Sequence, residues 1–441
     1  MSDFNAEAQR RRGWEVRRLK TLASCNDEVL PESTSDFARI EYIEISDVDE
    51  SRGIFNSTFH VFKDAPSRAR RIARKGDVII STVRTYLKAI ATIEREGLVV
   101  STGFAVLRAR TSVLPRFLAY AVKSAVFKDN VVRYSTGTSY PAINASDLMC
   151  LSIPLPPISE QKAIVAYLDA ETGRIDKAIA AEERMIALLQ ERREIVINEA
   201  VGGGMDFNAE TQRRRGWEER RLKSLLKKPL QYGANEAAEE SDNSQPRYIR
   251  ITDIDDSGKL REETFRSLPM EKAKPYLLEK GDLLFARSGA TAGKSFLFKE
   301  DYAACFAGYL IRASLTSAIT PEYLFYFTQS GEYRQWKEAV FIQATIQNIS
   351  AEKYGNLPIP LPPLPEQEEI VKRLDAETGK IDRAIEVKRR QIELLRERRQ
   401  IVIDEAVRGE PRRREPLQKL TRATAKPGAA DAAPYKTKGG A

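Results

Sequence analysis

Histidine and cysteine are scarce in this chain. Its 441 residues include one histidine, His60, and three cysteines, Cys25, Cys150 and Cys305. A single histidine excludes the zinc motifs that need two, and it argues against a histidine-based catalytic triad. The cysteines are far apart and lack metal-binding spacing, so we expect reduced thiols and no disulfide framework.

Long apolar runs are also missing. No stretch approaches the roughly 18 apolar residues that span a bilayer. The opening MSDFNAEAQRRRGWE has no apolar signal core, so we expect a cytoplasmic protein without membrane contact. The sequence contains no methyltransferase NPPY-type loop, cofactor-binding glycine loop, nuclease cluster or metal-ligand spacing. We therefore expect a chain that is not an enzyme and holds no cofactor or metal of its own.

The net charge of +8 is unevenly distributed. Residues 408–441 contain nine basic and three acidic side chains, which leaves 62 basic against 60 acidic in the rest. The overall charge is therefore weak evidence for nucleic-acid binding, and local clusters have to carry that case.

The chain is an internal duplication. DFNAEAQRRRGWE at residues 3–15 returns as DFNAETQRRRGWE at 206–218, with 12 of 13 positions identical. Residues 155–201 and 361–407 are identical at 30 of 47 positions. The offset stays between 203 and 206, which indicates a duplication of a whole unit.

Each repeat ends in a long polar helix. The prolines of IPLPPISEQ and IPLPPLPEQ prevent helix formation until the last proline, after which a heptad stripe of mainly apolar residues runs for about 40 residues. Such a rod would be roughly 60 Å long. An apolar seam needs a partner, and we expect the two rods to pair antiparallel. The candidate pairing residues are Leu168, Ile175, Ile179, Glu182, Ile186, Leu189, Leu374, Ile381, Ile385, Lys388, Ile392 and Leu395.

One difference between the rods supports this pairing. Glu182 and Glu183 in the first rod are replaced by Lys388 and Arg389 in the second. Opposite charges near the crossing point would favour the mixed pair over two like copies. The alternative is that each amphipathic helix packs only on its own domain.

The predicted fold is α/β or α+β, with two strand-rich domains joined by two long antiparallel coiled-coil helices in a pseudo-twofold repeat. The expected divisions are a leader and first domain (1–158), a first spacer helix (159–201), a glycine-rich linker with the repeated leader (202–216), a second domain (217–364), a second spacer helix (365–408) and a basic disordered tail (409–441).

Two dissimilar domains between near-identical proline-capped helices resemble the DNA-specificity (S) subunits of type I restriction-modification systems. The resemblance is carried by LSIPLPPISEQKAIVAYLDAETGRIDKAI, LPIPLPPLPEQEEIVKRLDAETGKIDRAI, NISAEKYGNLPIPLPP and the two GW dipeptides at 13–14 and 216–217. It covers residues 13–408, while the repeated DFNAE-QRRR leader and the basic tail depart from it.

This resemblance implies two target recognition domains, each reading one half of a split site in double-stranded DNA. It also implies that the helices dock two copies of an adenine methyltransferase subunit, with a motor-nuclease restriction subunit as a further partner. S-adenosylmethionine, ATP and magnesium are then expected on the partner subunits.

The stretch GATAGKS at residues 289–295 looks like a phosphate-binding P-loop. A P-loop needs four residues between its first glycine and Gly-Lys and must open a helix, whereas three residues separate Gly289 from Gly293 and the strand-like SFLF follows. The first repeat has no glycine here. We interpret the stretch as a hairpin loop that approaches DNA.

Basic, amide and aromatic side chains near such loops are the candidates for phosphate and base contacts. We expect the basic residues of SRARRIARK to form a phosphate-contacting cluster. We expect the alternate residues of STVRTYLK to share one face of a strand. The candidates in the first domain are Arg68, Arg70, Arg71, Arg74, Thr82, Arg84, Tyr86, Lys88, Arg133, Tyr134, Ser139 and Tyr140. Those in the second are Arg287, Ser288, Thr291, Lys294, Arg334, Gln335, Lys337, Gln343, Thr345 and Gln347.

Two other classes of function stay open at this point. A non-catalytic coiled-coil scaffold would have the rods but would bind DNA weakly and without preference. A P-loop NTPase would bind nucleotide with magnesium as an isolated chain.

Overall fold

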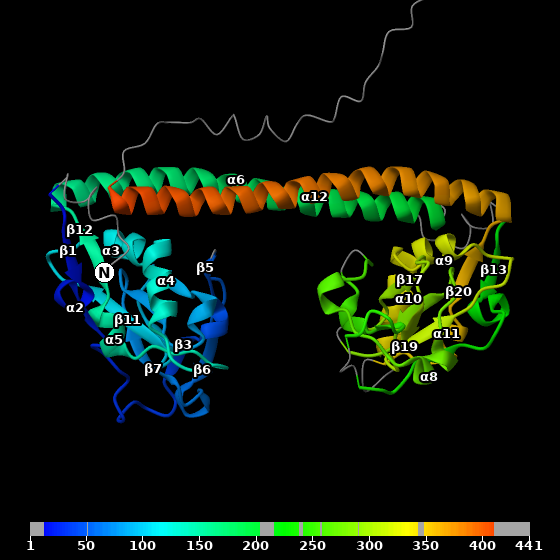
Figure 1. Ribbon diagram of the computed structural model, residues 1–441, viewed down its shortest axis with the longest axis horizontal. Helices are drawn as coiled ribbons and strands as arrows, with labels where there is room; N and C mark the ends of the chain where they lie inside the picture. Colours follow the sequence, from blue (N-terminus) through cyan, green and yellow to red (C-terminus); the bar gives the residue numbers. More distant parts are fainter. Residues whose placement is uncertain are drawn as a thin grey trace, which may run out of the picture. The chain divides into compact units, whose positions relative to one another are not determined.

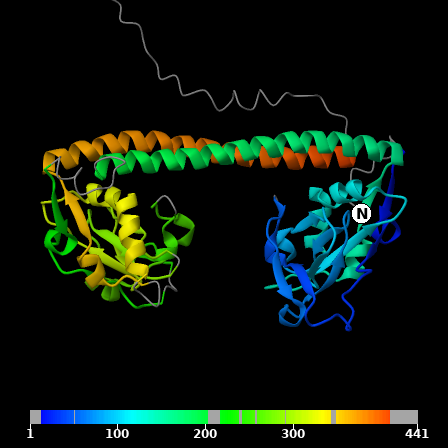
Figure 2. The same ribbon diagram turned by 180° about the vertical axis from the view of Figure 1, so that it is seen from behind.

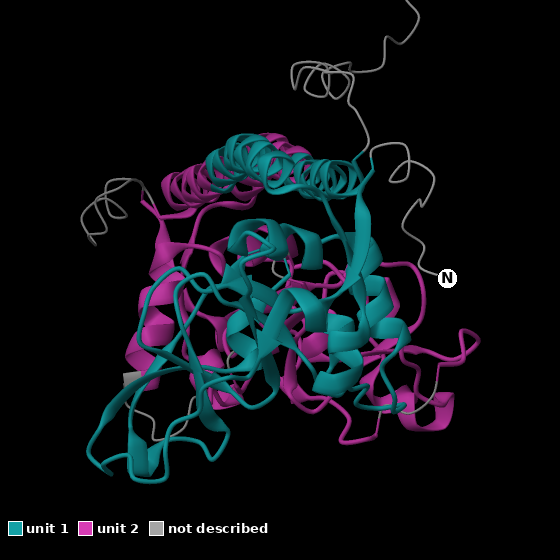
Figure 3. Ribbon diagram, turned by 90° about the vertical axis from the view of Figure 1, so that its left-hand side faces the viewer, with its two compact units in different colours: residues 1–183, 389–441 teal, residues 184–388 magenta. Residues whose placement is uncertain are grey.

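The computed structural model describes residues 13–50, 52–202, 216–237, 241–255, 258–289, 291–342 and 348–409. The repeated leader and the basic tail, for which a linker and disorder were expected, lie outside these residues. The chain divides into two compact units, one of residues 1–183 with 389–441 and the other of residues 184–388. Figure 3 colours the two units, and each includes part of both long helices.

Two four-stranded sheets form the centre of unit 1. The first has the order β2 (Ala23–Cys25), β11 (Phe104–Ala109), β8 (Val78–Ser81) and β9 (Ile90–Thr92). The second has the order β6 (Thr58–Val61), β3 (Arg39–Ile43), β10 (Leu98–Ser101) and β7 (Ala69–Ala73). The apolar runs of β8 and β10 are buried throughout, as expected for strands covered on both faces.

Two two-stranded ribbons accompany these sheets: β1 (Glu15–Arg18) with β12 (Ser152–Leu155), and β4 (Val48–Asp49) with β5 (Gly53–Ile54). The helices of unit 1 are α2 (Leu19–Leu22), α3 (Pro115–Val122), α4 (Ala125–Arg133) and α5 (Ala145–Cys150), with 3-10 turns at Ile45–Asp47, Phe62–Asp64 and Thr85–Leu87. Pro115 begins α3, and Ser124 caps α4 by accepting from Phe127 N. Figure 1 shows α3 between the long helices and the sheets of this unit.

Unit 2 repeats this plan. Its strands are β13 (Glu218–Arg221) paired with β20 (Pro358–Leu361), β15 (Arg247–Ile249) paired with β18 (Ala304–Phe306), and a sheet in the order β14 (Gln231–Tyr232), β19 (Leu310–Ala313), β16 (Leu283–Ala286) and β17 (Ser295–Leu297). Its helices are α8 (Met270–Ala273), α9 (Pro321–Phe327), α10 (Gly331–Ile342) and α11 (Ala351–Gly355), with 3-10 turns at Leu222–Leu225, Ile251–Asp253, Glu262–Thr264 and Lys274–Tyr276.

The long helices are α6 (Ile158–Val201) and α12 (Leu364–Arg408). Each begins directly after its proline pair, one residue before the position expected from the sequence. Figure 2 shows both helices from behind. The predicted architecture of two α/β domains with two long antiparallel helices is confirmed.

The antiparallel register is set by a repeated ion pair. In unit 1, Arg399 Nε donates to Asp176 Oδ1 at 2.8 Å. In unit 2, Arg193 Nε donates to Asp382 Oδ1 at 2.9 Å. Asp382 is the repeat equivalent of Asp176, and Arg399 that of Arg193, so the same pair forms twice with its two repeats exchanged. This exchange is the signature of a pseudo-twofold repeat.

The predicted helix-pairing residues are buried to different extents. The structure buries Leu168, Ile175, Leu374, Ile385 and Ile392. It leaves half-buried Ile179, Glu182, Ile186, Leu189, Ile381, Lys388 and Leu395. Glu183, beside Glu182, lies 3.6 Å from Arg396.

The alternative, in which each helix packs on its own domain, holds only for the first half of each rod. The first part of α6 contributes Leu168 and Ile175 to the core of unit 1, next to Val402 and Val407 from the last part of α12. The last part of α6 contributes Val196 and Ile197 to the core of unit 2. Each rod therefore packs its beginning on the domain of its own repeat and its end on the domain of the other repeat.

Buried glutamines fix the start of each rod. The amide oxygen of Gln161 accepts from Leu114 N at 2.8 Å, and its amide nitrogen donates to Pro156 O at 2.9 Å. Gln367 makes the same two contacts in unit 2, with Thr320 N at 2.8 Å and Pro362 O at 2.8 Å. Both glutamines are fully buried, so these bonds replace water for every polar group involved.

Candidate nucleic-acid interface

A pair of loops recurs in both units at the same place in the fold. The first loop follows β8 in unit 1 and β16 in unit 2. The second loop precedes α5 and α11. In unit 1, Ile143 N donates to Thr82 O at 2.9 Å, and in unit 2, Ile349 N donates to Arg287 O at 2.8 Å. Short β-bridges, Val83 with Ala142 and Ser288 with Asn348, tie the loops together.

The first loop of unit 1 is a turn. STVRTYLK was expected to place alternate residues on one face of a strand, and this expectation is wrong. A 3-10 turn at Thr85–Leu87 is flanked by Arg84 and Lys88, whose φ angles of 51° and 50° are left-handed. The left-handed residues reverse the chain, so strand parity no longer determines which side chains share a face.

Arginine and tyrosine side chains gather on this loop pair. The Arg84 guanidinium lies 5.4 Å from the centre of the Tyr140 ring. Tyr86, Tyr134 and Tyr140 are exposed. Lys88 pairs with Asp129 at 3.0 Å, and the Thr82 hydroxyl donates to Gly103 O at 2.9 Å. Among these residues, the exposed side chains are therefore one cation, Arg84, and three aromatic rings.

Two further candidates complete the second loop of unit 1. Arg133 ends α4, and Ser139 lies beside Tyr140. Both are exposed. The structure thus brings together the candidates from STVRTYLK and from VVRYSTGTSY, which are about 50 residues apart in sequence.

In unit 2 the first loop is a glycine hairpin between β16 and β17. Gly289 and Gly293 have φ angles of +75° and +88°. A Cβ at Gly293 would lie 2.3 Å from Lys337 Cδ, so that lysine side chain would have to move, and the left-handed φ angle favours glycine in any case. Strand β17 follows the hairpin. The absence of a helix at this position matches the hairpin interpretation, because a P-loop needs a helix N-terminus.

Arg287 is held in place beside the hairpin. Its guanidinium lies 4.9 Å from the centre of the Tyr232 ring. Its Nε is buried without a hydrogen-bond partner among the described residues. Ser288, Thr291 and Lys294 are half-buried. The hairpin turn is closed by Lys294 N, which donates to Thr291 O at 3.0 Å.

These loop pairs lie in the two halves of the chain that match a known sequence family. The family described as "Type I restriction modification DNA specificity domain" matches residues 11–187 and 214–395. The chain belongs to the type I restriction-modification DNA-specificity family. The first loop pair falls in the first match, and the second in the other.

Specificity subunits of this family resemble the chain over most of its length. The EcoKI specificity subunit of Escherichia coli K12 is 25% identical over 388 residues, covering 82% of each chain. The StySPI specificity subunit of Salmonella potsdam is 23% identical over 380 residues, covering 82% of this chain and 81% of the relative. A chain from a solved type I R-M system assembly is 25% identical, with a TM-score of 0.64 over 90% of this chain and 98% of that one. The resemblance found in the sequence is confirmed.

The arginine cluster SRARRIARK of this specificity-family chain was expected to form one phosphate-binding surface, and the structure separates its members. Arg68 is exposed before β7. Arg70 lies over the Phe62 ring at 4.9 Å, whereas Arg71 buries one guanidinium nitrogen that has no hydrogen-bond partner in the described part of the chain. Burial lowers the pKa of Arg71. Strand alternation in β7 accounts for this split.

Arg74 is already paired within the unit. Its Nε and one Nη donate to Glu28 Oε2 at 3.0 and 2.8 Å. Arg108 also donates to Glu28, and hydrogen bonds from these two arginines lower the pKa of the Glu28 carboxyl. The acid was not foreseen, because Glu28 lies 46 residues from Arg74.

The α10 candidates of unit 2 also differ among themselves. Arg334 pairs with Glu194 of α6 at 2.6 Å, which directs it to the long helix. Gln335 is exposed, and Lys337 packs over Gly293. The remaining candidates, Gln343, Thr345 and Gln347, lie outside the described residues.

Three residues in the second loop pair or directly against it were missed by sequence reasoning. Tyr232 lies under Arg287, and its hydroxyl accepts from Ala351 N at 3.0 Å. Tyr309 is 63% exposed beside Arg287, which donates its backbone N–H to Tyr309 O at 3.0 Å. Asn348 buries its side-chain oxygen without a partner among the described residues. The signal for Tyr309 was its alignment with Gly103, where the repeats exchange an aromatic for a glycine.

Within the described residues, no group of three His, Cys, Asp or Glu side chains could hold a metal ion. Among the same residues, no helix is long and apolar enough to cross a membrane.

Proposed function

We propose that this chain reads a bipartite, asymmetric site in double-stranded DNA, with one half-site recognised by each unit. In this proposal the chain does no chemistry itself and acts in the cytoplasm. It directs adenine methyltransferase and restriction subunits to the site, and S-adenosylmethionine, ATP and magnesium belong to those partners.

The observation that carries this proposal is one frame with two different loop pairs. The bond from Ile143 N to Thr82 O and the bond from Ile349 N to Arg287 O hold the second loop to the first in each unit. The side chains presented on this common support differ. Two recognition loops that share a backbone frame but carry different side chains are expected to bind two different half-sites and not two identical ones.

The chemistry of both loop pairs suits base recognition. Arginine can donate two hydrogen bonds to guanine, and tyrosine rings can stack on Arg or contact bases. Arg84 with Tyr140 in unit 1 and Arg287 with Tyr232 in unit 2 are such pairs. A coiled-coil scaffold without a recognition function has no need for them.

Two similar anchors on the rods support binding of two like partners. Trp14 Nε1 donates to Glu160 at 2.9 Å, and Trp217 Nε1 donates to Glu366 at 3.1 Å. The repeated surfaces around α6 and α12 would therefore offer the same contacts to each of two copies of a methyltransferase subunit.

The test is a methylation map of DNA from cells that express this chain with its cognate methyltransferase. A new split motif that requires this chain is expected. Arg84→Ala should relax one half-site and leave the other unchanged, and Arg287→Ala should do the reverse. Each substitution should cost about 1–3 kcal/mol of discrimination at the affected base.

Each variant is the control for the other, because their arginines occupy matching loops. A motif whose two halves change together in either variant would contradict the assignment of one half-site to each unit. No new motif despite a stable complex with the methyltransferase would refute the recognition function.

A further inference from the structure

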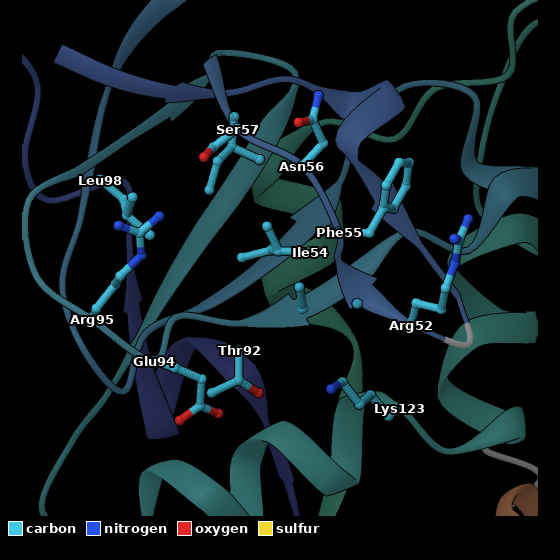
Figure 4. A pocket seen from close by; sticks show the side chains of 13 residues that line it. Arg52, Ile54, Phe55, Asn56, Ser57, Thr92, Glu94, Arg95, Leu98 and Lys123 are labelled. Atoms are coloured by element: carbon cyan, nitrogen blue, oxygen red, sulfur yellow. The ribbon is translucent and has the colours of Figure 1, made fainter. Parts of the chain in front are cut away.

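A cleft of about 560 Å³ opens in unit 1, on residues that the loop pair does not use. It is lined by Ile43, Arg52, Gly53, Ile54, Phe55, Asn56, Ser57, Ala91, Thr92, Glu94, Arg95, Leu98 and Lys123. Its volume lies within the range of about 300–1,000 Å³ that is usual for small-molecule sites. Figure 4 shows Arg95 and Lys123 on opposite sides of the cleft, with Ile54 between them.

The lining is cationic. Arg52, Arg95 and Lys123 face one acid, Glu94, for a formal excess of two positive charges. Arg95 pairs with Glu41, and Arg52 lies 4.0 Å from Asp49. Glu94 lies 3.9 Å from Arg116. Both arginines keep more than half of their side-chain surface exposed, so their outer N–H groups can still meet a ligand.

Unit 2 lacks this charge at the matching positions. The repeat equivalences follow from shared backbone bonds: Gly76 N donates to Ile93 O, and Gly281 N donates to Phe298 O. This offset of 205 makes Lys299 and Glu300 the equivalents of Glu94 and Arg95. The pairing of Val48 with Ile54 and of Ile254 with Leu260 makes Gly258 the equivalent of Arg52. The bonds from Tyr120 to Asp169 and from Tyr326 to Asp375 make Gln329 the equivalent of Lys123. Their formal charges cancel. The common frame therefore does not need the positive excess.

Lys123 is the most informative member of this set. It follows the last residue of α3, and Gln400 of α12 donates to its carbonyl oxygen at 3.1 Å. No carboxylate lies within ion-pair distance of its ammonium among the described residues. In unit 2 the equivalent Gln329 accepts from Arg193 at 2.8 Å. In unit 1 Arg399, the equivalent of Arg193, pairs with Asp176 and its charge repels the Lys123 ammonium.

Placing an ammonium here carries a cost. Burial, followed by repulsion from Arg399, lowers the pKa of Lys123 to about 8. Glu94 and Asp176 act in the opposite direction, and Arg116 adds to the repulsion. A glutamine satisfies the same position in unit 2 without that cost. A charge that the frame does not require, directed at a cleft, indicates a ligand of opposite sign.

We propose that this cleft binds a phosphate group through Lys123 and Arg95, with Arg52 at its rim. The phosphate belongs either to a free nucleotide or to the DNA backbone. At the four matching described positions of unit 2 the formal charges cancel, so we expect this binding in unit 1 and not in unit 2.

The probes are inorganic pyrophosphate and AMP, titrated calorimetrically into the full chain. The test variant is Lys123→Gln, which introduces the residue that unit 2 carries at this place and is therefore expected to fold. The control variant is Lys162→Gln, which removes one charge from an exposed position on α6. We expect one site per chain and at least a tenfold weaker affinity in Lys123→Gln, with no change in Lys162→Gln.

The second arm measures binding to DNA duplexes of several unrelated sequences. If neither free anion binds, but Lys123→Gln weakens every duplex by the same factor and lowers the salt slope by about one, the phosphate is that of DNA. If neither free anion nor DNA affinity responds to Lys123→Gln, or if both variants respond equally, the proposal is wrong. Neither arm depends on sequence-specific recognition, so failure of the proposed function would leave these results interpretable.

A pH profile adds a readout that a purely structural lysine would not move. Sulfate, used as the probe, keeps its charge between pH 6 and 9.5. Because the folded pKa of Lys123 is about 8, sulfate affinity should fall as the pH rises through this value. The affinity of Lys123→Gln should stay flat over the same range, and a wild-type profile equally flat would overturn the assignment to Lys123.

Discussion

Gln161→Leu should loosen the junction between α3 and α6 without disturbing unit 2. The glutamine is fully buried and joins three backbone groups: Leu114 N at 2.8 Å, Pro156 O at 2.9 Å and Ser112 O at 3.3 Å. Leucine has a similar size but no polar atoms. The substitution would therefore leave one half-buried donor, Leu114 N, and one buried acceptor, Pro156 O, without partners, whereas Ser112 is exposed and its carbonyl oxygen can bond to water.

Leaving one buried group unsatisfied costs about 1–3 kcal/mol. Carbonyl oxygens tolerate this better than N–H groups do, so we expect a total cost of about 2–4 kcal/mol for local opening. At about 1.4 kcal/mol per tenfold, the exchange of α3 amides should accelerate roughly 30- to 700-fold.

Hydrogen exchange is the suitable assay, because unfolding of a chain with two units need not be two-state. The matched control is Gln367→Leu, which removes the equivalent contacts to Thr320, Ala318 and Pro362 in unit 2. It should accelerate α9 and leave α3 unchanged. Unaltered α3 exchange in Gln161→Leu, or equal acceleration in both units, would show that the glutamine is not the junction described above.

Three further outcomes follow from the same structure. Asp176→Arg should lower the melting temperature slightly, because a partly exposed ion pair contributes about 0.2–1 kcal/mol. Combining Asp176→Arg with Arg399→Asp should recover that loss. A double variant no more stable than the single one would contradict the pairing. Changing Lys388 and Arg389 to glutamate should weaken the helix pair and lower the unfolding midpoint, and an unchanged midpoint would count against charge pairing at the rod centre. Burial raises the pKa of Cys305 to about 12, so its thiol stays protonated at pH 8.5. Alkylation at this pH should therefore modify the exposed Cys150 first, and Cys305 should react only at a higher pH or after unfolding. Early labelling of Cys305, mapped by mass spectrometry, would refute this.

The rods and the duplication could be predicted because they depend on short sequence motifs and on direct sequence identity between the repeats. Proline pairs determine where α6 and α12 begin, and 30 identical positions in 47 define the repeat. The division into compact units could not be predicted in the same way. Unit 1 takes its last core residues, such as Val402 and Val407, from the far end of the chain, and no local pattern announces that.

The candidate site was predicted as segments and not as individual side chains. Its loops were found because turns and basic residues are visible in sequence. Which side chains remain exposed depends on partners from elsewhere in the fold: Glu28 takes Arg74, and Glu194 takes Arg334. The left-handed turn at Arg84 was equally hidden, because non-glycine residues adopt that conformation only where the surrounding structure imposes it.

The order of the two units along the chain has a consequence for biosynthesis. Unit 2 is continuous, whereas unit 1 waits for residues 389–408 to complete its core. A ribosome reaches them roughly 200 residues after finishing α6, which takes about 10–40 s at 5–20 residues per second. During that interval the first domain has emerged without the Val402 and Val407 side of its core, so nascent unit 1 should be the part of this protein that chaperones engage.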